Sequence, residues 1–239
     1  MEDLDRVTST REFAASQLMD LSMIEIRSDH EVVFQSERFG LYEENLLNLE
    51  LAGRTYPCFC TRKEIREAAQ APHGELLRYP GTCRNLSVSE RRIRAEARSP
   101  AVRLRVDEVT RNEGMVDDIV LRRNDGVPAY NLAVVVDDEL QGITQVVRGI
   151  DLESVTPSQR YLQRLLGFRE LEYIHVGLVV GPDGERLAKR HGAVTLGDWV
   201  AAGGSPAGLR RVLETTLRDR PISAPCPVGD IWAFLAAGC

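Results

Sequence analysis

Residues 127–152 read VPAYNLAVVVDDELQGITQVVRGIDL. The run from Asn131 to Leu140 has the apolar density of a buried helix, and VVRG after it is a short buried strand that ends near Arg148. In an open α/β sheet, ligands bind beyond the carboxyl ends of the strands. The stretch therefore predicts an α/β fold in which Arg148 points into a crevice and can clamp a carboxylate. A structural ion pair between Arg148 and Asp151 would explain the same spacing.

The flanking sequence continues this alternation of strands and helices. A helix is predicted from about Glu37 to Ala52, and Thr156-Pro157 predicts the start of another helix. Strands are predicted at AVRLRV from Ala101, at TQVVRG, at YIHVGLVV and on both sides of the turn at Asp125. Capping boxes predict three more helix starts, at Ser9 with Glu12, Thr61 with Glu64, and Ser87 with Glu90. This order of elements indicates an α/β layer architecture.

Size and composition indicate a globular protein. The chain has 239 residues, of which 43% are hydrophobic, and a formal net charge of −6. There is no apolar run of the roughly 18 residues that a membrane span needs and no signal-peptide pattern, so we expect a cytoplasmic protein, and we expect it to be a monomer. The net charge does not favour nucleic-acid binding, but Arg84–Arg105 holds a local arginine cluster. That cluster is either a solvated helix face or a surface for a polyanion.

The segment CFCTRKEIREAAQAPHGELLRYPGTC, residues 58–83, carries a candidate metal site. Five cysteines in an intracellular chain do not indicate a disulfide framework, and three of them, Cys58, Cys60 and Cys83, lie in this segment. A tetrahedral zinc site needs a fourth ligand, which His73 or Tyr79 could supply. General chemistry favours the imidazole of His73, because a phenol must first lose or share its proton. The alternative is that the cysteines share a small core by accident.

A third motif, GPDGERLAKRHGAVTL, places Lys189 in a basic loop between glycines after a predicted strand. A lysine on such a loop can approach a phosphate and withdraw. An ordinary exposed basic loop has the same composition.

Together and in this order, PAYNLAVVVDD, VVRGIDL and ERLAKRHGAVTL resemble blocks of the class I glutamyl-tRNA synthetases and of their short relatives, the glutamyl-queuosine tRNA(Asp) synthetases. EDLDR, at residues 2–6, resembles the acidic block of that family, and CFC with YPGTC resembles the zinc pattern of the short relatives. The resemblance runs from Met1 to about Trp199. It implies a Rossmann-like class I catalytic domain that is truncated at its N-terminus and contains a zinc-binding insertion.

The resemblance also implies roles for individual residues. Glu2 would face the amino group of substrate glutamate, and Tyr130 and Arg148 would complete its pocket. Lys189 would be the lysine of the KMSKS-type loop and would bind ATP phosphates. The zinc ligands implied by the family pattern are Cys58, Cys60, Tyr79 and Cys83, which places Tyr79 before His73.

The implied layout has three parts: 1–55 as the first part of the catalytic domain, 56–110 as the zinc-binding insertion, and 111–239 as the second part with the KMSKS-type loop. Only 50 residues follow Lys189 in the 239-residue chain, too few for an anticodon-binding domain, and this favours the short relatives. The implied reaction activates glutamate with ATP and Mg²⁺ and transfers it to the queuosine base in the anticodon of tRNA(Asp).

The first strand, its arginine motif and the HIGH-type motif of the family are absent from the sequence. We expect either a gene start upstream of Met1 or a truncated, catalytically impaired paralogue that acts as a zinc-containing tRNA-binding module; a fragment of a glutamyl-tRNA synthetase is a further alternative. Without those motifs we expect little glutamate-dependent ATP–pyrophosphate exchange. The nucleotide sequence upstream of Met1 would distinguish the first two possibilities.

Overall fold

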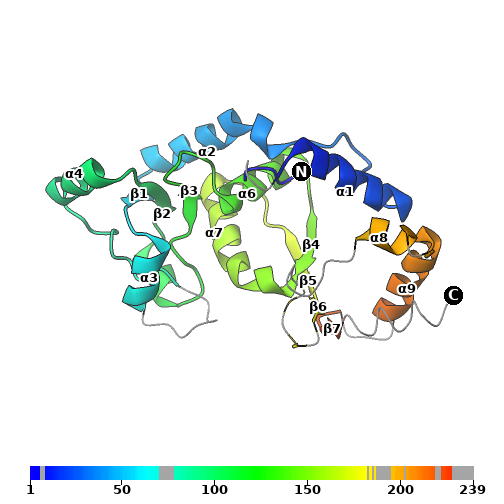
Figure 1. The fold of residues 1–239 in the computed structure, drawn as a ribbon. Coiled ribbons are helices and arrows are strands. Elements are labelled where there is room, and N and C mark those ends of the chain that lie inside the picture. Colours follow the sequence, from blue (N-terminus) through cyan, green and yellow to red (C-terminus); the bar gives the residue numbers. More distant parts are fainter. Residues whose placement is uncertain are drawn as a thin grey trace.

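The computed structural model describes residues 1–5, 9–69, 78–181, 183–184, 186, 195–201, 203–218 and 222–227. Figure 1 shows a three-stranded sheet with α3 and α4 at one end, a parallel strand pair near the middle, and α8 and α9 at the opposite end. The helices are α1 (Arg11–Met23), α2 (Phe39–Leu51), α3 (Arg62–Ala69), α4 (Val88–Ala97), α5 (Glu108–Asn112), α6 (Tyr130–Leu140), α7 (Thr156–Leu166), α8 (Leu196–Ala201) and α9 (Pro206–Arg218). Two 3₁₀ turns, η1 (Gln35–Glu37) and η2 (Ile150–Val155), precede α2 and α7.

The strands form three small sheets in the described residues. The first has the antiparallel order β1-β2-β3, the second pairs β4 with β5 in parallel, and the third pairs β6 with β7 in parallel. The parallel register of β4 and β5 sets Arg148 opposite His175. The strand bounds are β1 (Thr55–Cys58), β2 (Ala101–Leu104), β3 (Val120–Arg122), β4 (Gln145–Gly149), β5 (Glu172–Val176), β6 (Val179–Val180) and β7 (Cys226–Pro227).

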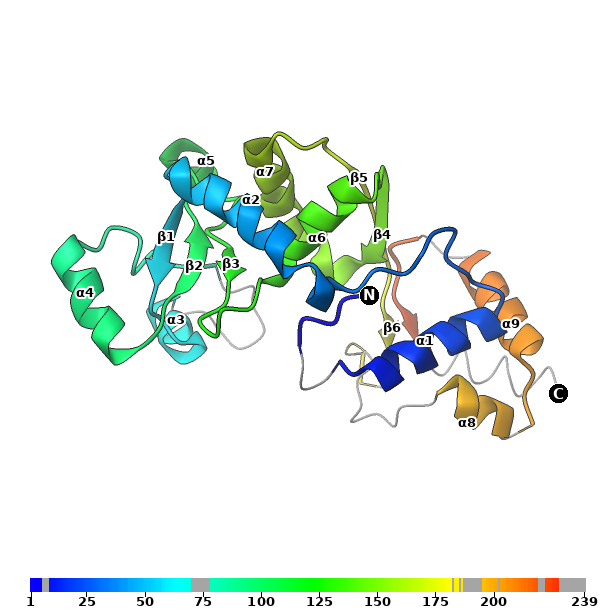
Figure 2. The ribbon, with the colours of Figure 1, turned by 90° about the horizontal axis from the view of Figure 1, so that it is seen from above.

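The main core lies where α2, α6 and α7 meet the three-stranded sheet. Figure 2 shows α2 and α6 side by side, and both contribute buried apolar faces to one cluster. Its most deeply buried side chains include Tyr42, Leu104, Leu121, Leu132 and Leu162. Burial of each such side chain contributes about 1.5–3 kcal/mol, so this cluster fixes the direction of α6 and of the functional residues at its ends.

Asp137 ties α6 to α2 by polar contacts inside this core. Its carboxylate accepts hydrogen bonds from Gln35 Nε2 at 3.1 Å and from Tyr42 Oη at 2.9 Å, and Arg38 lies 3.1 Å away. A buried carboxylate needs such partners, because an unpaired charge in the interior is very costly. The acidic end of α6 is therefore held in a fixed position.

The first residues of the chain lie along residues 33–36. The Met1 ammonium donates to Val33 O at 2.6 Å, and Gln35 N donates to Met1 O at 3.1 Å. Asp3 accepts from the backbone N–H and hydroxyl of Ser36, and Leu4 is buried in the main core. Glu2 is thereby held beside the start of α6.

Two details differ from the sequence-based expectation. Thr10, one residue after the expected Ser9, is the N-cap of α1, because its hydroxyl accepts from Phe13 N at 3.3 Å. After the Asp125 turn there is an isolated bridge from Arg122 to Pro128 in place of a second strand. Pro128 has no N–H to extend a ladder, and α6 begins two residues later. The capping boxes at Thr61 and Ser87 are confirmed.

Candidate active site and metal centre

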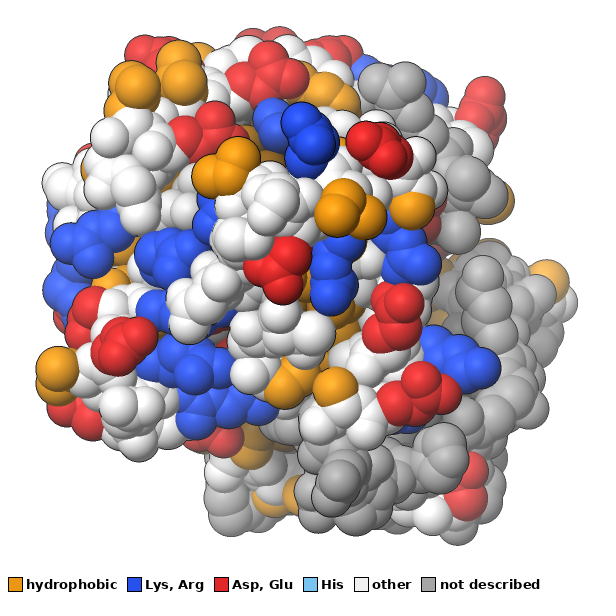
Figure 3. Space-filling model, turned by 90° about the vertical axis from the view of Figure 1, so that its left-hand side faces the viewer, with side chains coloured by type: hydrophobic (Ala, Val, Ile, Leu, Met, Phe, Trp, Pro, Cys, Tyr) orange, Lys and Arg blue, Asp and Glu red, His pale blue; other side chains and the backbone are white. Residues whose placement is uncertain are grey.

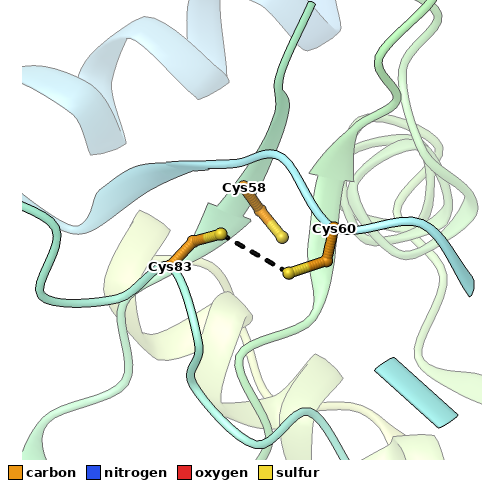
Figure 4. A group of neighbouring side chains, drawn as sticks. All are labelled: Cys58, Cys60 and Cys83. Atoms are coloured by element: carbon orange, nitrogen blue, oxygen red, sulfur yellow. Dashed lines mark hydrogen bonds between the residues drawn. The ribbon is translucent and has the colours of Figure 1, made fainter. Parts of the chain in front are cut away.

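Three cysteine side chains converge where β1 ends. Figure 4 shows Cys58, Cys60 and Cys83 pointing toward one another, with the Sγ atoms of Cys60 and Cys83 3.5 Å apart. All three sulfurs lie within 4.8 Å of one another, so the group could hold a metal ion. Cys58 and Cys83 are buried, and Cys60 is half-buried.

Tyr79 brings a fourth donor atom to the same point. Its Oη lies 3.4 Å from Cys58 Sγ and 3.7 Å from Cys60 Sγ. A tetrahedral zinc ion would separate two sulfur ligands by about 3.8 Å and a sulfur from an oxygen by about 3.5 Å, given its usual bond lengths. The three thiols and the phenol therefore fit one zinc ion. His73, the alternative fourth ligand, lies outside the described residues.

A turn at Gly81 makes this convergence possible. Gly81 has φ +88°, and a Cβ on it would lie 2.9 Å from Nη2 of Arg111. Only glycine adopts that conformation without strain and leaves the guanidinium its place. The turn lets Cys83 N donate to Tyr79 Oη at 2.8 Å, which holds the phenol oxygen over the cysteines.

The surroundings of the cysteines act differently on the individual thiols. Burial raises the pKa of Cys60 to about 12. For Cys83, burial acts in the same direction, but hydrogen bonds led by the one from Phe59 N lower its pKa overall. Arg94 Nη1 lies 3.9 Å from Cys83 Sγ, and the Arg103 guanidinium stacks 3.8 Å from the centre of the Tyr79 ring. Zinc with three thiolates carries a net negative charge, which these two arginines would offset.

A second group of predicted residues meets at the start of α6. Burial raises the pKa of Glu2, and the Met1 ammonium and then Arg148 act against that increase. Burial also raises the pKa of Tyr130, followed by the charge of Glu2, whereas its charge interaction and hydrogen bond with Arg148 act to lower it. The structure thus brings the three predicted glutamate-binding residues into one electrostatic neighbourhood, with Asp138 beside them.

Arg148 is bound by protein groups in a way that the sequence does not indicate. It donates to Gln159 Oε1 and Thr156 Oγ1, both at 2.7 Å, to Leu152 O at 3.1 Å, and to His175 Nε2 at 3.4 Å. A guanidinium has five N–H donors, so four of them are used. A two-pronged clamp on a substrate carboxylate would require one of these contacts to open.

The alternative partner proposed for Arg148 is occupied elsewhere. Asp151 forms an ion pair with Arg186, with 2.5 Å between Arg186 Nη1 and Asp151 Oδ2. Arg148 instead lies over the ring of Tyr173, 4.8 Å from its centre. The interpretation of Arg148 as a structural arginine paired with Asp151 is therefore wrong.

A cleft of about 600 Å³ joins the two groups of residues. Glu2 and Tyr130 line one part of it, and Cys58 and Cys60 line another. Arg62 and other polar side chains also face it. The chain thus places two cysteines of the candidate metal site and side chains of opposite charge on the walls of one cavity. The remaining lining residues are Leu4, Asp5, Gln35, Ile65, Ala101, Arg103, Val120, Arg123, Asn124, Pro128 and Ala129.

The sequence matches a family model described as "tRNA synthetases class I (E and Q), catalytic domain" over residues 1–213. The chain belongs to this class I synthetase family. A relative from Nocardia farcinica, named glutamyl-Q tRNA(Asp) synthetase, is 51% identical over 227 residues, which cover 91% of this chain and 72% of the relative. Relatives with the same name from Cutibacterium acnes and Symbiobacterium thermophilum are 50% and 42% identical, over 85% and 86% of this chain and 61% and 71% of their own lengths.

Solved structures support the class I synthetase fold. A glutamate tRNA ligase from Elizabethkingia meningosepticum has a TM-score of 0.69 at 21% identity, covering 97% of this chain and 56% of that one. A glutamate-tRNA synthetase from Elizabethkingia anophelis has a TM-score of 0.62 at 24% identity, covering 80% of this chain and 45% of that one. The α/β class I fold expected from the sequence is confirmed.

Several residues around the synthetase site were not assigned from the sequence. Gln159, Thr156 and His175 all contact Arg148 or each other, and Gln159 is fully buried. The available signal was the run of polar residues at the start of α7, which occupies positions where a core helix would carry apolar side chains. Lys189, the expected phosphate-binding residue, lies outside the described residues.

The arginine-rich segment is only partly a surface feature of the synthetase. Arg84 and Arg103 are buried, and Arg98 pairs with Glu64 at 2.9 Å. Arg105 stacks over Tyr56 and donates to Arg84 O at 2.7 Å. Figure 3 shows basic side chains gathered on the end of the molecule that carries α3 and α4, with acidic ones among them. Internal contacts thus account for about half of a pattern that the sequence shows as a single cluster.

The described part of the synthetase chain contains no helix that is long and apolar enough to cross a bilayer.

Asp138 should make the stability of the synthetase depend on pH. Burial, followed by the charge of Asp137, raises the pKa of Asp138 from 3.8 to about 6. Between pH 3.8 and about 6, the folded state therefore holds a proton on Asp138 that the unfolded chain releases. The contribution of Asp138 to the free energy of unfolding is fully present below this range and is lost as the pH rises through about 6. Asp138→Asn should raise the free energy of unfolding at pH 7.5 by about 1–2 kcal/mol, a figure reduced for solvent screening.

Urea unfolding at pH 5 and pH 7.5 measures this effect. Glu50→Gln, which removes an exposed carboxylate on α2, is the control and should change neither value by more than about 0.5 kcal/mol. A loss of stability in Asp138→Asn at pH 7.5 would contradict the prediction, as would an equal gain at both pH values.

Proposed function

We propose that this chain activates glutamate with ATP and transfers it to the queuosine base in the anticodon of tRNA(Asp). The observation that carries the proposal is that Glu2 and Tyr130 line a cleft that also borders Cys58 and Cys60, while Arg148 interacts with Tyr130 beside it, in a chain of the class I synthetase family. The names of its relatives favour this activity over the alternatives of a tRNA-binding module and a glutamyl-tRNA synthetase fragment.

The charges of the cleft support a role in holding an amino acid. The carboxylate of Glu2 would attract the ammonium group of glutamate, and Arg148 would attract a carboxylate. Tyr130 interacts with both charges, because Glu2 raises its pKa and Arg148 lowers it. Opposed charges close to one another orient a zwitterion in a single direction, which is how a binding site prepares a carboxylate for attack.

In the proposed reaction, a glutamate carboxylate oxygen attacks the α-phosphorus of ATP. The bond from that phosphorus to the bridging oxygen breaks, and glutamyl-adenylate and pyrophosphate form. A hydroxyl of queuosine then attacks the activated carbonyl, and AMP leaves. Lys189 is proposed to neutralise the ATP phosphates, and Mg²⁺ would accompany ATP as its counter-ion.

Zinc is the metal that we propose for the cysteine cluster, with Cys58, Cys60, Tyr79 and Cys83 as ligands. The distances among the four donor atoms support this choice. Zinc there would be structural, because four protein ligands leave no open position for substrate. Its effect would be to hold β1 and the loop around Gly81 together at the wall of the cleft. The three-part domain layout, the monomeric state and the cytoplasmic location stay predictions.

A transfer assay with radiolabelled glutamate tests the proposal. Label should accumulate on queuosine-containing tRNA(Asp) at least about tenfold more than on the same tRNA with guanosine at that position. This ratio does not depend on the absolute rate of the chain. Arg148→Gln should reduce the transfer by about 100-fold or more, whereas Arg164→Gln, a change at an exposed ion pair with Glu170, should leave it unchanged.

Two other results would favour the alternatives. Label on tRNA(Glu) in preference to tRNA(Asp) would indicate a fragment of a glutamyl-tRNA synthetase. Binding of queuosine-containing tRNA(Asp) without any glutamate-dependent exchange of pyrophosphate into ATP would indicate a binding module.

A further inference from the structure

We propose that Gln159 is a positioning residue that fixes the Arg148 guanidinium and couples it to the helix that carries Tyr130. This inference rests on the proposed function, in which Arg148 faces a carboxylate of glutamate. Gln159 is on α7, Arg148 is on β4 and Tyr130 begins α6, so the residue would link three separate elements.

The side-chain amide of Gln159 accepts a hydrogen bond through its oxygen and donates one through its nitrogen. Its Oε1 accepts from Arg148 Nη1 at 2.7 Å, and its Nε2 donates to Asn131 Oδ1 at 2.9 Å. Asn131 is the residue next to Tyr130 in the first turn of α6. A flip of the amide would lose both bonds, since its oxygen would then face Asn131 Oδ1, another acceptor, and its NH₂ group would face the Arg148 guanidinium, another donor.

The burial of Gln159 makes these contacts decisive. Its side chain is 0% exposed, at a position on α7 where an apolar residue would pack without needing partners. A buried amide without partners is costly, so an amide is favoured at this position only because Arg148 and Asn131 satisfy it. Packing alone gives no reason for it.

Arg148 gains a defined orientation from this arrangement. Leu152 O and Thr156 Oγ1 hold its Nη2, His175 holds its Nε, and Gln159 holds Nη1. These four bonds leave one N–H, on Nη1, and Arg148 also interacts with Tyr130, which lines the cleft. Gln159 thus leaves Arg148 at most one donor, beside Tyr130, together with its positive charge, which suits a one-point contact with a carboxylate rather than a fork.

Arginine side-chain NMR of the full chain tests the positioning directly and needs no substrate. With ¹⁵N- and ¹³C-labelled arginine, Arg148 should give separate Nη–H signals because rotation of its guanidinium is hindered, and Arg148→Lys identifies them. Gln159→Met, of similar volume but without an acceptor, should merge or broaden these signals. Gln163→Met removes another buried amide from α7 that does not contact Arg148, and it should leave them resolved. Unchanged signals in Gln159→Met would overturn the proposal.

Calorimetric titration with glutamate gives the functional consequence. Gln159→Glu keeps the shape but sets a negative charge against Arg148, so glutamate affinity should fall by about tenfold or more, while Gln159→Met should lose about three- to tenfold. ATP affinity and the thermal unfolding midpoint should stay close to those of Gln163→Met. Equal or tighter glutamate binding by Gln159→Met would mean that the freed N–H serves the substrate, and positioning by Gln159 would be refuted. If the NMR signals change but the unaltered chain does not bind glutamate, the positioning stands and the proposed function fails.

Discussion

Cys83→Ser is expected to lower the zinc content of the purified protein from about one equivalent per chain to below about one tenth. Cys83 supplies a buried sulfur to the cluster, and it is the one cysteine of the three that lies in the turn after Gly81. Serine binds zinc far more weakly than a thiolate does, and the remaining two thiols cannot complete a tetrahedron. Metal analysis of the purified protein gives the zinc content. Hydrogen exchange should show that residues 55–60 and 78–87 lose protection together.

Two further variants separate the possible fourth ligands. Tyr79→Phe keeps the ring that stacks with Arg103 but removes Oη, so zinc affinity should fall by about 10–100-fold. His73→Ala should leave the affinity unchanged. The opposite pattern would assign the fourth position to His73, and full zinc content in Cys83→Ser would exclude the proposed ligand set.

Asp118→Ala is expected to reduce the free energy of unfolding by about 3–5 kcal/mol, the usual cost of leaving one member of a buried ion pair without its partner. Asp118 is 0% exposed, and Arg84 Nη1 lies 2.7 Å from both of its carboxylate oxygens. Tyr56 Oη at 2.7 Å and Val106 N at 3.0 Å donate to the same group. Removal of the carboxylate would leave a buried guanidinium and two further donors unsatisfied. Denaturant unfolding measures the loss.

A double-mutant cycle is the control for this prediction. Asp118→Asn and Arg84→Met should each be strongly destabilising, but the double variant should be more stable than the sum of their effects predicts by about 2 kcal/mol or more. An additive result would show that the pair contributes no coupling, and a loss of less than about 1 kcal/mol in Asp118→Ala would show that water replaces the carboxylate.

Local patterns predicted much of the fold. The helix from Glu37 to Ala52 and the strand that ends near Arg148 follow from periodicity and terminal residues, both of which act over a few residues. The cysteine cluster could also be predicted from the sequence, because only Phe59 separates Cys58 from Cys60 and YPGTC carries its own turn. Family resemblance added Tyr79, which general ligand chemistry ranked second.

Contacts between distant residues were not predictable in this way. Arg84 and Asp118 are 34 positions apart, and nothing in either local sequence marks them as partners. The same is true of Gln159, whose polar character was visible but whose contact with Arg148 depends on how α7 packs beside β4. Arginine runs were misleading for a related reason, because a guanidinium that is later buried looks the same in sequence as one that stays in solvent.

Helix α4 contains no buried residue, and ten residues are too few for a helix to be stable by itself in water. Beyond its capping box, hydrogen bonds join this helix and its C-cap to the rest of the protein, from Arg94 to Cys83 and from Arg98 to Phe59 O and Glu64. Two of these three partners belong to the cysteine cluster or to the residue between its first two members. These contacts link the arginines at this end of the protein to the cysteine cluster. With the zinc proposed for the cluster, loss of the metal or oxidation of the cysteines would alter the electrostatic face of this protein without a change to any residue on that face.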